Sequence, residues 1–154
     1  MQISNLTDHY KDDPRFDKLL EQINSGAHAR FHLKGLIGSS LSLAAFTIIE
    51  KLNGIHLFIL NDKEAAAYFY NDIENLWQEA EEDYTNKRIL FYPTSYKRPY
   101  QVAETDNANV LLRSEVLNRL SSQPKMAIVV TYPEALTEKV ITKKNFIYFT
   151  MMTV

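Results

Sequence analysis

The sequence predicts one α/β domain with a mainly parallel sheet and helices on both faces. Short apolar segments alternate with longer segments whose apolar residues recur every three or four positions, and short polar stretches separate them. The chain has 154 residues, 45% hydrophobic and 23% charged, which is typical of one globular domain. We expect an N-terminal helix in residues 1–26, an α/β core in residues 27–145 and a terminal strand in residues 146–154.

The N-terminal segments have clear local signals. Carboxylates and an early proline at Asp12–Pro14 mark a helix start, apolar residues follow at helical spacing up to Ile23, and the Ser-Gly pair at 25–26 ends the helix. In residues 29–34, Ala, Phe and Leu alternate with Arg, His and Lys, which predicts a short strand. This strand is expected to run directly into a glycine loop.

The middle of the chain predicts a helix, a strand and a second helix. Residues 42–52 are apolar and free of Gly and Pro, so we expect a mostly buried helix with the Asn-Gly pair at 53–54 as a left-handed cap. Residues 55–60, IHLFIL, form a continuous apolar run that favours a buried parallel strand. Residues 62–77 predict an amphipathic helix with Asp62 as its N-cap.

The C-terminal half repeats the pattern. We expect a strand in residues 89–92, a polar loop in residues 94–109, a helix in residues 110–120 and a buried strand in residues 127–130. The final segment, residues 146–154, is apolar and prone to form a strand. Unpaired, such a strand promotes aggregation, so we expect it to be covered by this sheet or by a continuation of the chain.

Charge, cysteine content and hydropathy exclude several functions. Lys and Arg number 17 and Asp and Glu 19, so the net charge of −2 provides no overall positive field for nucleic acid or an anionic membrane. Without cysteine there is no disulfide, thiolate nucleophile or Cys-ligated metal. The N-terminus lacks the pattern of a secretory signal, and no apolar run reaches about 18 residues. We expect a cytoplasmic protein without a membrane partner.

The glycine loop is the most informative segment. Its residues are Gly35, Gly38, Ser39, Ser40, Leu41 and Ser42, between a predicted strand and a predicted helix. A phosphate loop of the form G-x-x-x-x-G-K-[ST] uses its lysine to neutralise polyphosphate and its hydroxyl to hold Mg²⁺. In that register Ser42 is the hydroxyl, but Leu41 replaces the lysine and Ser40 replaces the preceding glycine. The alternative is that the two glycines only permit a tight turn.

A second element of phosphoryl transfer is also missing. Magnesium and the attacking water require an acidic residue at the end of a later apolar strand. The strand predicted at residues 127–130 is followed by Thr131, Tyr132 and Pro133, and Glu134 stands where a helix normally has an N-terminal carboxylate. We therefore expect a degenerate loop.

Four segments follow one another in a recognisable order: LKGLIGSSLSLAAFTIIEKL, IHLFILNDKEAAAYFYNDIENL, ILFYP and LLRSEVLNRLSSQPKMAIVVTYPEALTEKV, which together cover about residues 31–140. Their order and spacing resemble the N-terminal region of the bacterial transcription-repair coupling factor (Mfd), whose first module is similar to the repair helicase subunit UvrB. This resemblance implies a RecA-like module, descended from an ATPase, that no longer binds nucleotide. The segment between the third predicted strand and the following helix is too short for the DNA-gripping hairpin of UvrB-like proteins.

The resemblance also implies a role. A full-length coupling factor displaces stalled RNA polymerase by ATP-driven translocation on DNA and recruits UvrA through its N-terminal region. ATP, Mg²⁺ and DNA would be bound by other domains, and UvrA mainly by a following domain, so no UvrA-contact residue is assigned here. For this chain we expect a non-catalytic scaffold without a cofactor. The alternatives are a divergent nucleotide- or phosphate-binding enzyme, in which the amides of residues 38–42 hold phosphate, and a stand-alone adaptor.

Other residue groups give weaker signals. The candidate contact residues for nucleic acid or a partner are Tyr96, Lys97, Arg98 and Tyr100, which place two cations between two aromatic rings. The net negative charge and the lack of a second basic cluster favour an ordinary exposed loop there. No carboxylate completes a metal site with His28 and His32, and no His–Asp pair serves Ser39 or Ser40 as nucleophiles. We expect no metal ligand and no catalytic residue.

Two further features lie at the end of the helix predicted at residues 62–77. The acidic run formed by Glu79, Glu81, Glu82 and Asp83 is expected to be a solvated helix end or loop. Trp77, beside it, is a candidate for a partner contact.

Overall fold

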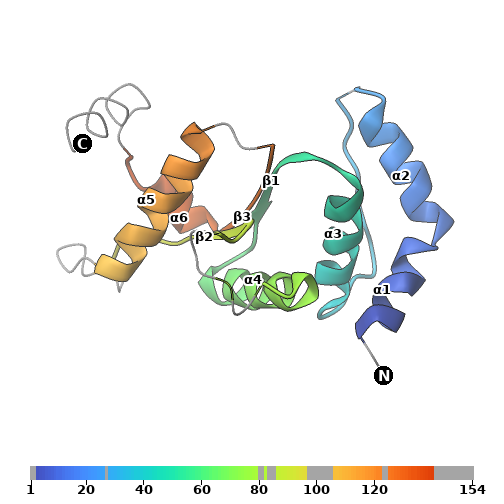
Figure 1. Ribbon diagram of the computed structural model, residues 1–154, viewed down its shortest axis with the longest axis horizontal. Coiled ribbons are helices and arrows are strands. Elements are labelled where there is room, and N and C mark those ends of the chain that lie inside the picture. The colour runs from blue at the N-terminus through green and yellow to red at the C-terminus, as the bar shows by residue number, and fades with distance from the viewer. Residues whose placement is uncertain are drawn as a thin grey trace.

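The computed structural model contains a small parallel sheet with helices packed around it (Figure 1). The structure describes residues 3–26, 28–79, 82, 86–96, 106–122 and 125–140. The strands are β1 (Gly54–Ile59), β2 (Ile89–Tyr92) and β3 (Met126–Thr131), in the spatial order β1-β3-β2. The predicted α/β class is confirmed, and each of the three strands lies where the sequence predicted one.

The helices precede, connect and follow the strands. Their bounds are α1 (Ile3–Lys11), α2 (Pro14–Asn24), α3 (Ser40–Lys51), α4 (Lys63–Trp77), α5 (Asn107–Ser121) and α6 (Pro133–Thr137). Figure 1 shows α1, α2 and α3 gathered at one end of the molecule and α5 and α6 at the other. Among the parts of the chain described, no helix is long and apolar enough to cross a membrane.

Helices cover both faces of the sheet. Phe58 of β1 and Phe91 of β2 lie on one face, because both pair in register with the same residue of β3. This face packs against α4, where the rings of Phe58 and Phe69 are 4.9 Å apart. Tyr92 lies on the opposite face, where the guanidinium of Arg113 in α5 is 4.2 Å from its ring centroid. The core therefore fills two layers, one on each side of β3.

Strand β1 is an edge strand with one open face. Ile55, Leu57 and Ile59 have exposed fractions of 55%, 54% and 53%. They share the face on which α5 packs, but α5 packs mainly on β2. The prediction of a parallel strand is confirmed, whereas the prediction that the strand is buried is wrong on this face. Continuous apolar sequence indicates a strand, but burial depends on where the helices lie.

The strand predicted before the glycine loop is absent. Residues 28–37 form an irregular segment, and its apolar residues Phe31 and Leu33 are 39% and 46% exposed. A strand requires a neighbouring backbone to pair with, and none of the described strands lies alongside this segment. The prediction from alternating residues 29–34 is therefore wrong, and the glycine turn is not entered from the sheet.

Helix ends predicted from local chemistry agree with the structure in two cases. Asp13 caps α2 by accepting a hydrogen bond from the amide of Arg15, and Asp62 caps α4 by accepting from the amide of Ala65 at 2.8 Å. Gly26, at the predicted end of α2, has a φ of 72°. Such side-chain caps depend on nearby residues alone, which is why sequence patterns locate them well.

Two other predictions about helix ends are wrong. Helix α3 ends at Lys51, and the next residue, Leu52, is extended. Gly54 has a φ of 126°, so the Asn-Gly pair does not form a left-handed cap but leads into β1. The N-terminal segment forms two helices where one was predicted, because α1 precedes the start signal at Asp13. The predicted terminal strand, residues 146–154, lies outside the described residues.

Candidate functional site

The glycine loop forms a compact turn at the start of α3. Gly35 and Gly38 have φ values of 82° and 58°, a region that favours glycine. The amide of Ser40 donates to the carbonyl of Ile37 at 3.3 Å, and the amide of Leu41 donates to the carbonyl of Gly38 at 3.4 Å. The Ser40 hydroxyl also donates to the Ile37 carbonyl, at 2.8 Å. Two of the amides that would surround a phosphate are thus engaged within the turn.

The side chains at the positions of the phosphate-loop lysine and hydroxyl also have other roles. Leu41 is 39% exposed and is apolar where a cation would be required. The Ser42 hydroxyl, where a phosphate loop holds Mg²⁺, donates to the Oδ2 atom of Asp72 at 2.9 Å. Asp72 lies on α4, 30 residues away in the sequence. The carboxylate gives the hydroxyl a partner within the chain, but it lies on a helix and not at the end of a strand, where a phosphate loop has its magnesium-binding carboxylate.

A groove lies beside this turn, between α3 and α4. Its volume is about 410 Å³. Its lining residues are Gly38, Ser39, Leu41, Ser42, Leu60, Ala65, Tyr68, Phe69 and Asp72. Asp72 is the one ionisable carboxylate of this lining, which contains no basic residue. The groove therefore suits an apolar group better than an anion.

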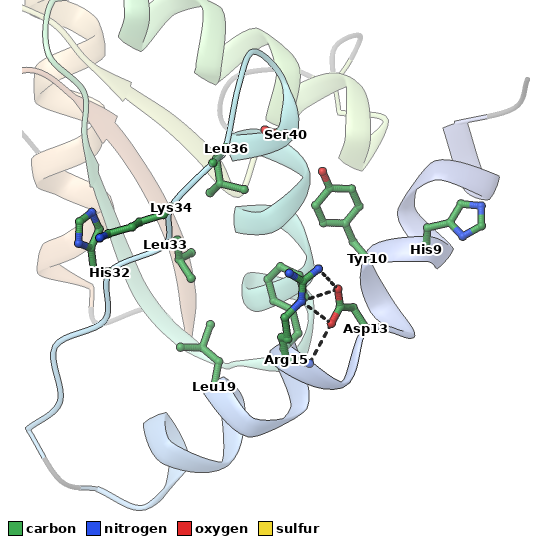
Figure 2. A pocket seen from close by; sticks show the side chains of 12 residues that line it. His9, Tyr10, Asp13, Arg15, Leu19, His32, Leu33, Lys34, Leu36 and Ser40 are labelled. Atoms are coloured by element: carbon green, nitrogen blue, oxygen red, sulfur yellow. Dashed lines mark hydrogen bonds and ion pairs between the residues drawn. The ribbon is translucent and has the colours of Figure 1, made fainter.

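A second cavity, of about 490 Å³, lies on the other side of the turn (Figure 2). It is enclosed by the corner between α1 and α2 and by the segment before the glycine turn. Figure 2 shows Leu19, Leu33 and Leu36 pointing into this space, while His9 points away from it and Lys34 extends toward His32. Three leucine side chains thus face this space, and several basic residues also belong to its lining.

One ion pair stands at the rim of this second cavity. The Nε atom of Arg15 donates to both carboxylate oxygens of Asp13, each at 3.0 Å. Hydrogen bonds from the Arg15 side chain and amide lower the pKa of Asp13 to about 2. The carboxylate is thus committed to Arg15 and to the start of α2, which gives it a structural role.

The cation and aromatic group at residues 96–100 is described only at Tyr96; Lys97, Arg98 and Tyr100 lie outside the described residues. The base of this segment is fixed, because the amide of Asp106 donates to the carbonyl of Ser95 at 2.8 Å. Ser95 in turn donates through its hydroxyl to Glu138 at 2.8 Å. The two flanks of the segment therefore lie side by side at the end of β2.

The chain after the helix predicted at residues 62–77 agrees only in part with the sequence interpretation. Glu79 is 7% exposed and its Oε1 atom is 2.6 Å from Nε of Arg88, so this carboxylate is buried and paired, against the prediction of a solvated run. Glu82 is exposed as predicted, and Glu81 and Asp83 lie outside the described residues. Trp77 packs edge-on against Phe46, with ring centroids 5.0 Å apart, and Arg88 lies over its ring at 5.3 Å. Glu79 and Trp77 thus both contact other parts of this chain.

No sequence pattern singled out Arg113, a buried residue with several polar contacts. Its exposed fraction is 6%, and its Nη1 atom donates to the carbonyls of Pro93 at 2.7 Å and Ala135 at 3.1 Å. The same atom is 3.0 Å from Oε2 of Glu138. Burial raises the pKa of the neighbouring Tyr92. Because these partners are 20 or more residues away, only the arginine within an otherwise apolar stretch hints at the cluster.

Neither a metal centre nor a relative identifies the site. Across the described ranges, no group of three or more His, Asp or Glu residues is placed to hold a metal ion. Comparisons of the chain with family models, curated proteins and solved structures give no match.

Proposed function

We propose that this chain is a non-catalytic, RecA-like scaffold module from the N-terminal region of a transcription-repair coupling factor. Its role is to support recruitment of UvrA to stalled RNA polymerase, with DNA, ATP and Mg²⁺ bound by other domains of the full-length protein. The proposal rests on the segments in residues 31–140 that resemble this family, and on a site that disfavours nucleotide.

The single observation that carries the non-catalytic role is Leu41 at the position of the phosphate-loop lysine, where its exposed side chain is apolar. The Ser42 hydroxyl, which would coordinate Mg²⁺, donates to the carboxylate of Asp72 at 2.9 Å, and the adjacent Leu41 supplies no cation. A nucleotide phosphate placed there would have no lysine to offset its charge. A turn that offers no cation supports packing and protein contact better than phosphoryl transfer.

The second candidate is a divergent nucleotide- or phosphate-binding enzyme. It is favoured by the basic residues in the lining of the second cavity, including Arg15 and Lys34, next to Gly35. Against it, Arg15 is paired with Asp13, and Lys34 extends away from the cavity interior (Figure 2). A third possibility is a stand-alone adaptor, a protein with the same α/β module but without the ATP-driven motor domains of a coupling factor.

The test uses the protein encoded by the complete reading frame that contains this sequence. Surface plasmon resonance with purified, immobilised UvrA should give saturable binding, which the Ser42→Ala variant retains. A complete product that does not bind UvrA would overturn the proposal. A reading frame that ends without helicase motifs, together with UvrA binding, would favour the adaptor.

A further inference from the structure

We propose that the groove between α3 and α4 is a docking site for a partner polypeptide that inserts an apolar side chain next to a lysine or arginine. This inference rests on the proposed function in one respect, that the chain acts through protein contacts. It adds the place of contact and the chemistry of the partner.

The first support is exposed apolar surface at the groove. Tyr68 is 77% exposed, Leu41 is 39% exposed, and both line the groove. Ile37, next to the lining residue Gly38, is 84% exposed. Tyrosine offers a large apolar area and a polar tip at a low cost in conformational entropy, which is why it is frequent at the centre of protein interfaces.

The second support is charge. Asp72 is partly buried in the groove, and its Oδ2 atom accepts a hydrogen bond from Ser42 at 2.9 Å. Its Oδ1 atom has no hydrogen bond to any described residue. With no basic residue in the lining, this carboxylate favours a cationic group and disfavours an anionic one. Charge complementarity thus selects a basic segment and disfavours a nucleotide.

The third support is size. A groove of about 410 Å³ is large enough for one or two side chains. The turn at residues 37–41 and the first half of α4 form its walls, and both are held by backbone hydrogen bonds. The site is therefore formed before the partner arrives, so little ordering is needed on binding.

The test is a titration of the whole chain, labelled with ¹⁵N, with phenethylammonium, an aromatic ring joined to a cation. The matched probe 3-phenylpropionate has the same ring and the opposite charge. We expect saturable shifts of the amide signals of Gly38, Leu41 and Ala65 at millimolar concentration, with phenethylammonium binding about fivefold more tightly than the anion.

Two variants locate the effect. Asp72→Asn should remove the preference for the cation while both probes still bind, and Tyr68→Ala should weaken both. Equal binding of the two probes by the unmodified chain, or no shift at these amides, would overturn the inference. Shifts that depend on protein concentration without a probe would do the same by showing that a second copy occupies the groove.

A parallel titration with Mg-ATP separates this inference from the proposed function. Shifts of the same amides by Mg-ATP would overturn both proposals. If neither Mg-ATP nor phenethylammonium shifts these amide signals, the docking site is refuted. The scaffold role is then tested by the UvrA binding measurement alone.

Discussion

Replacement of Arg113 by methionine should destabilise the fold more than any surface substitution. The side chain is 6% exposed, and Arg113→Met removes charge-assisted hydrogen bonds to the carbonyls of Pro93 and Ala135 and an ion pair with Glu138. Methionine retains much of the apolar volume, so the loss is mainly polar. Leaving buried acceptors and a carboxylate without their partner costs about 3–5 kcal/mol.

The assay is urea unfolding followed by fluorescence of Trp77, the single tryptophan, which packs against the core. The matched control is Lys51→Met, which removes an exposed pair with Asp17 and should cost about 0–1 kcal/mol. Glu138→Gln and the double variant complete a cycle, whose coupling energy should be about 0.5–3 kcal/mol. An Arg113→Met protein within about 1 kcal/mol of wild type would refute this reasoning.

Three further outcomes follow from other parts of the structure. Leu90→Ala should lower the free energy of unfolding by about 2–5 kcal/mol because Leu90 is 0% exposed, and Leu57→Ala by less than about 1 kcal/mol because Leu57 is 54% exposed. Equal urea midpoints for the two variants would contradict the open face of β1. Gly26→Ala should cost about 1–2 kcal/mol by thermal unfolding because φ is 72°, and a stabilised variant would exclude this backbone conformation. An NMR titration should give Asp13 a pKa of about 2, which Arg15→Gln returns toward 3.8. Because this pKa is lowered in the folded state, its contribution to stability is present above about pH 4 and is lost as the pH falls toward 2.

The sequence allowed the strands and most helices to be located because their signals are local. Asp13 and Asp62 cap helices through bonds to amides two or three residues away, and the apolar runs of β1, β2 and β3 identify strands without knowledge of the rest of the fold. The exceptions depended on distant neighbours. Residues 29–34 alternate as a strand does but have no strand beside them, and the open face of β1 follows from the position of α5.

The candidate site was predictable only in part. The glycine turn and the missing lysine at Leu41 are visible in the sequence. The contact of Ser42 with Asp72 spans 30 residues and crosses between two helices, and no pattern in a single sequence links the two positions. The groove that they share with Tyr68 is likewise a product of how α3 packs on α4.

The most direct test of the central claim, that this module does not bind nucleotide, is thermal unfolding of the chain with and without millimolar Mg-ATP or Mg-ADP. A ligand that binds only the folded state at 100 times its dissociation constant adds about 2.7 kcal/mol. We predict no change in the unfolding midpoint. A clear rise that is lost in Gly38→Val would contradict the scaffold account and make the glycine turn a working nucleotide site.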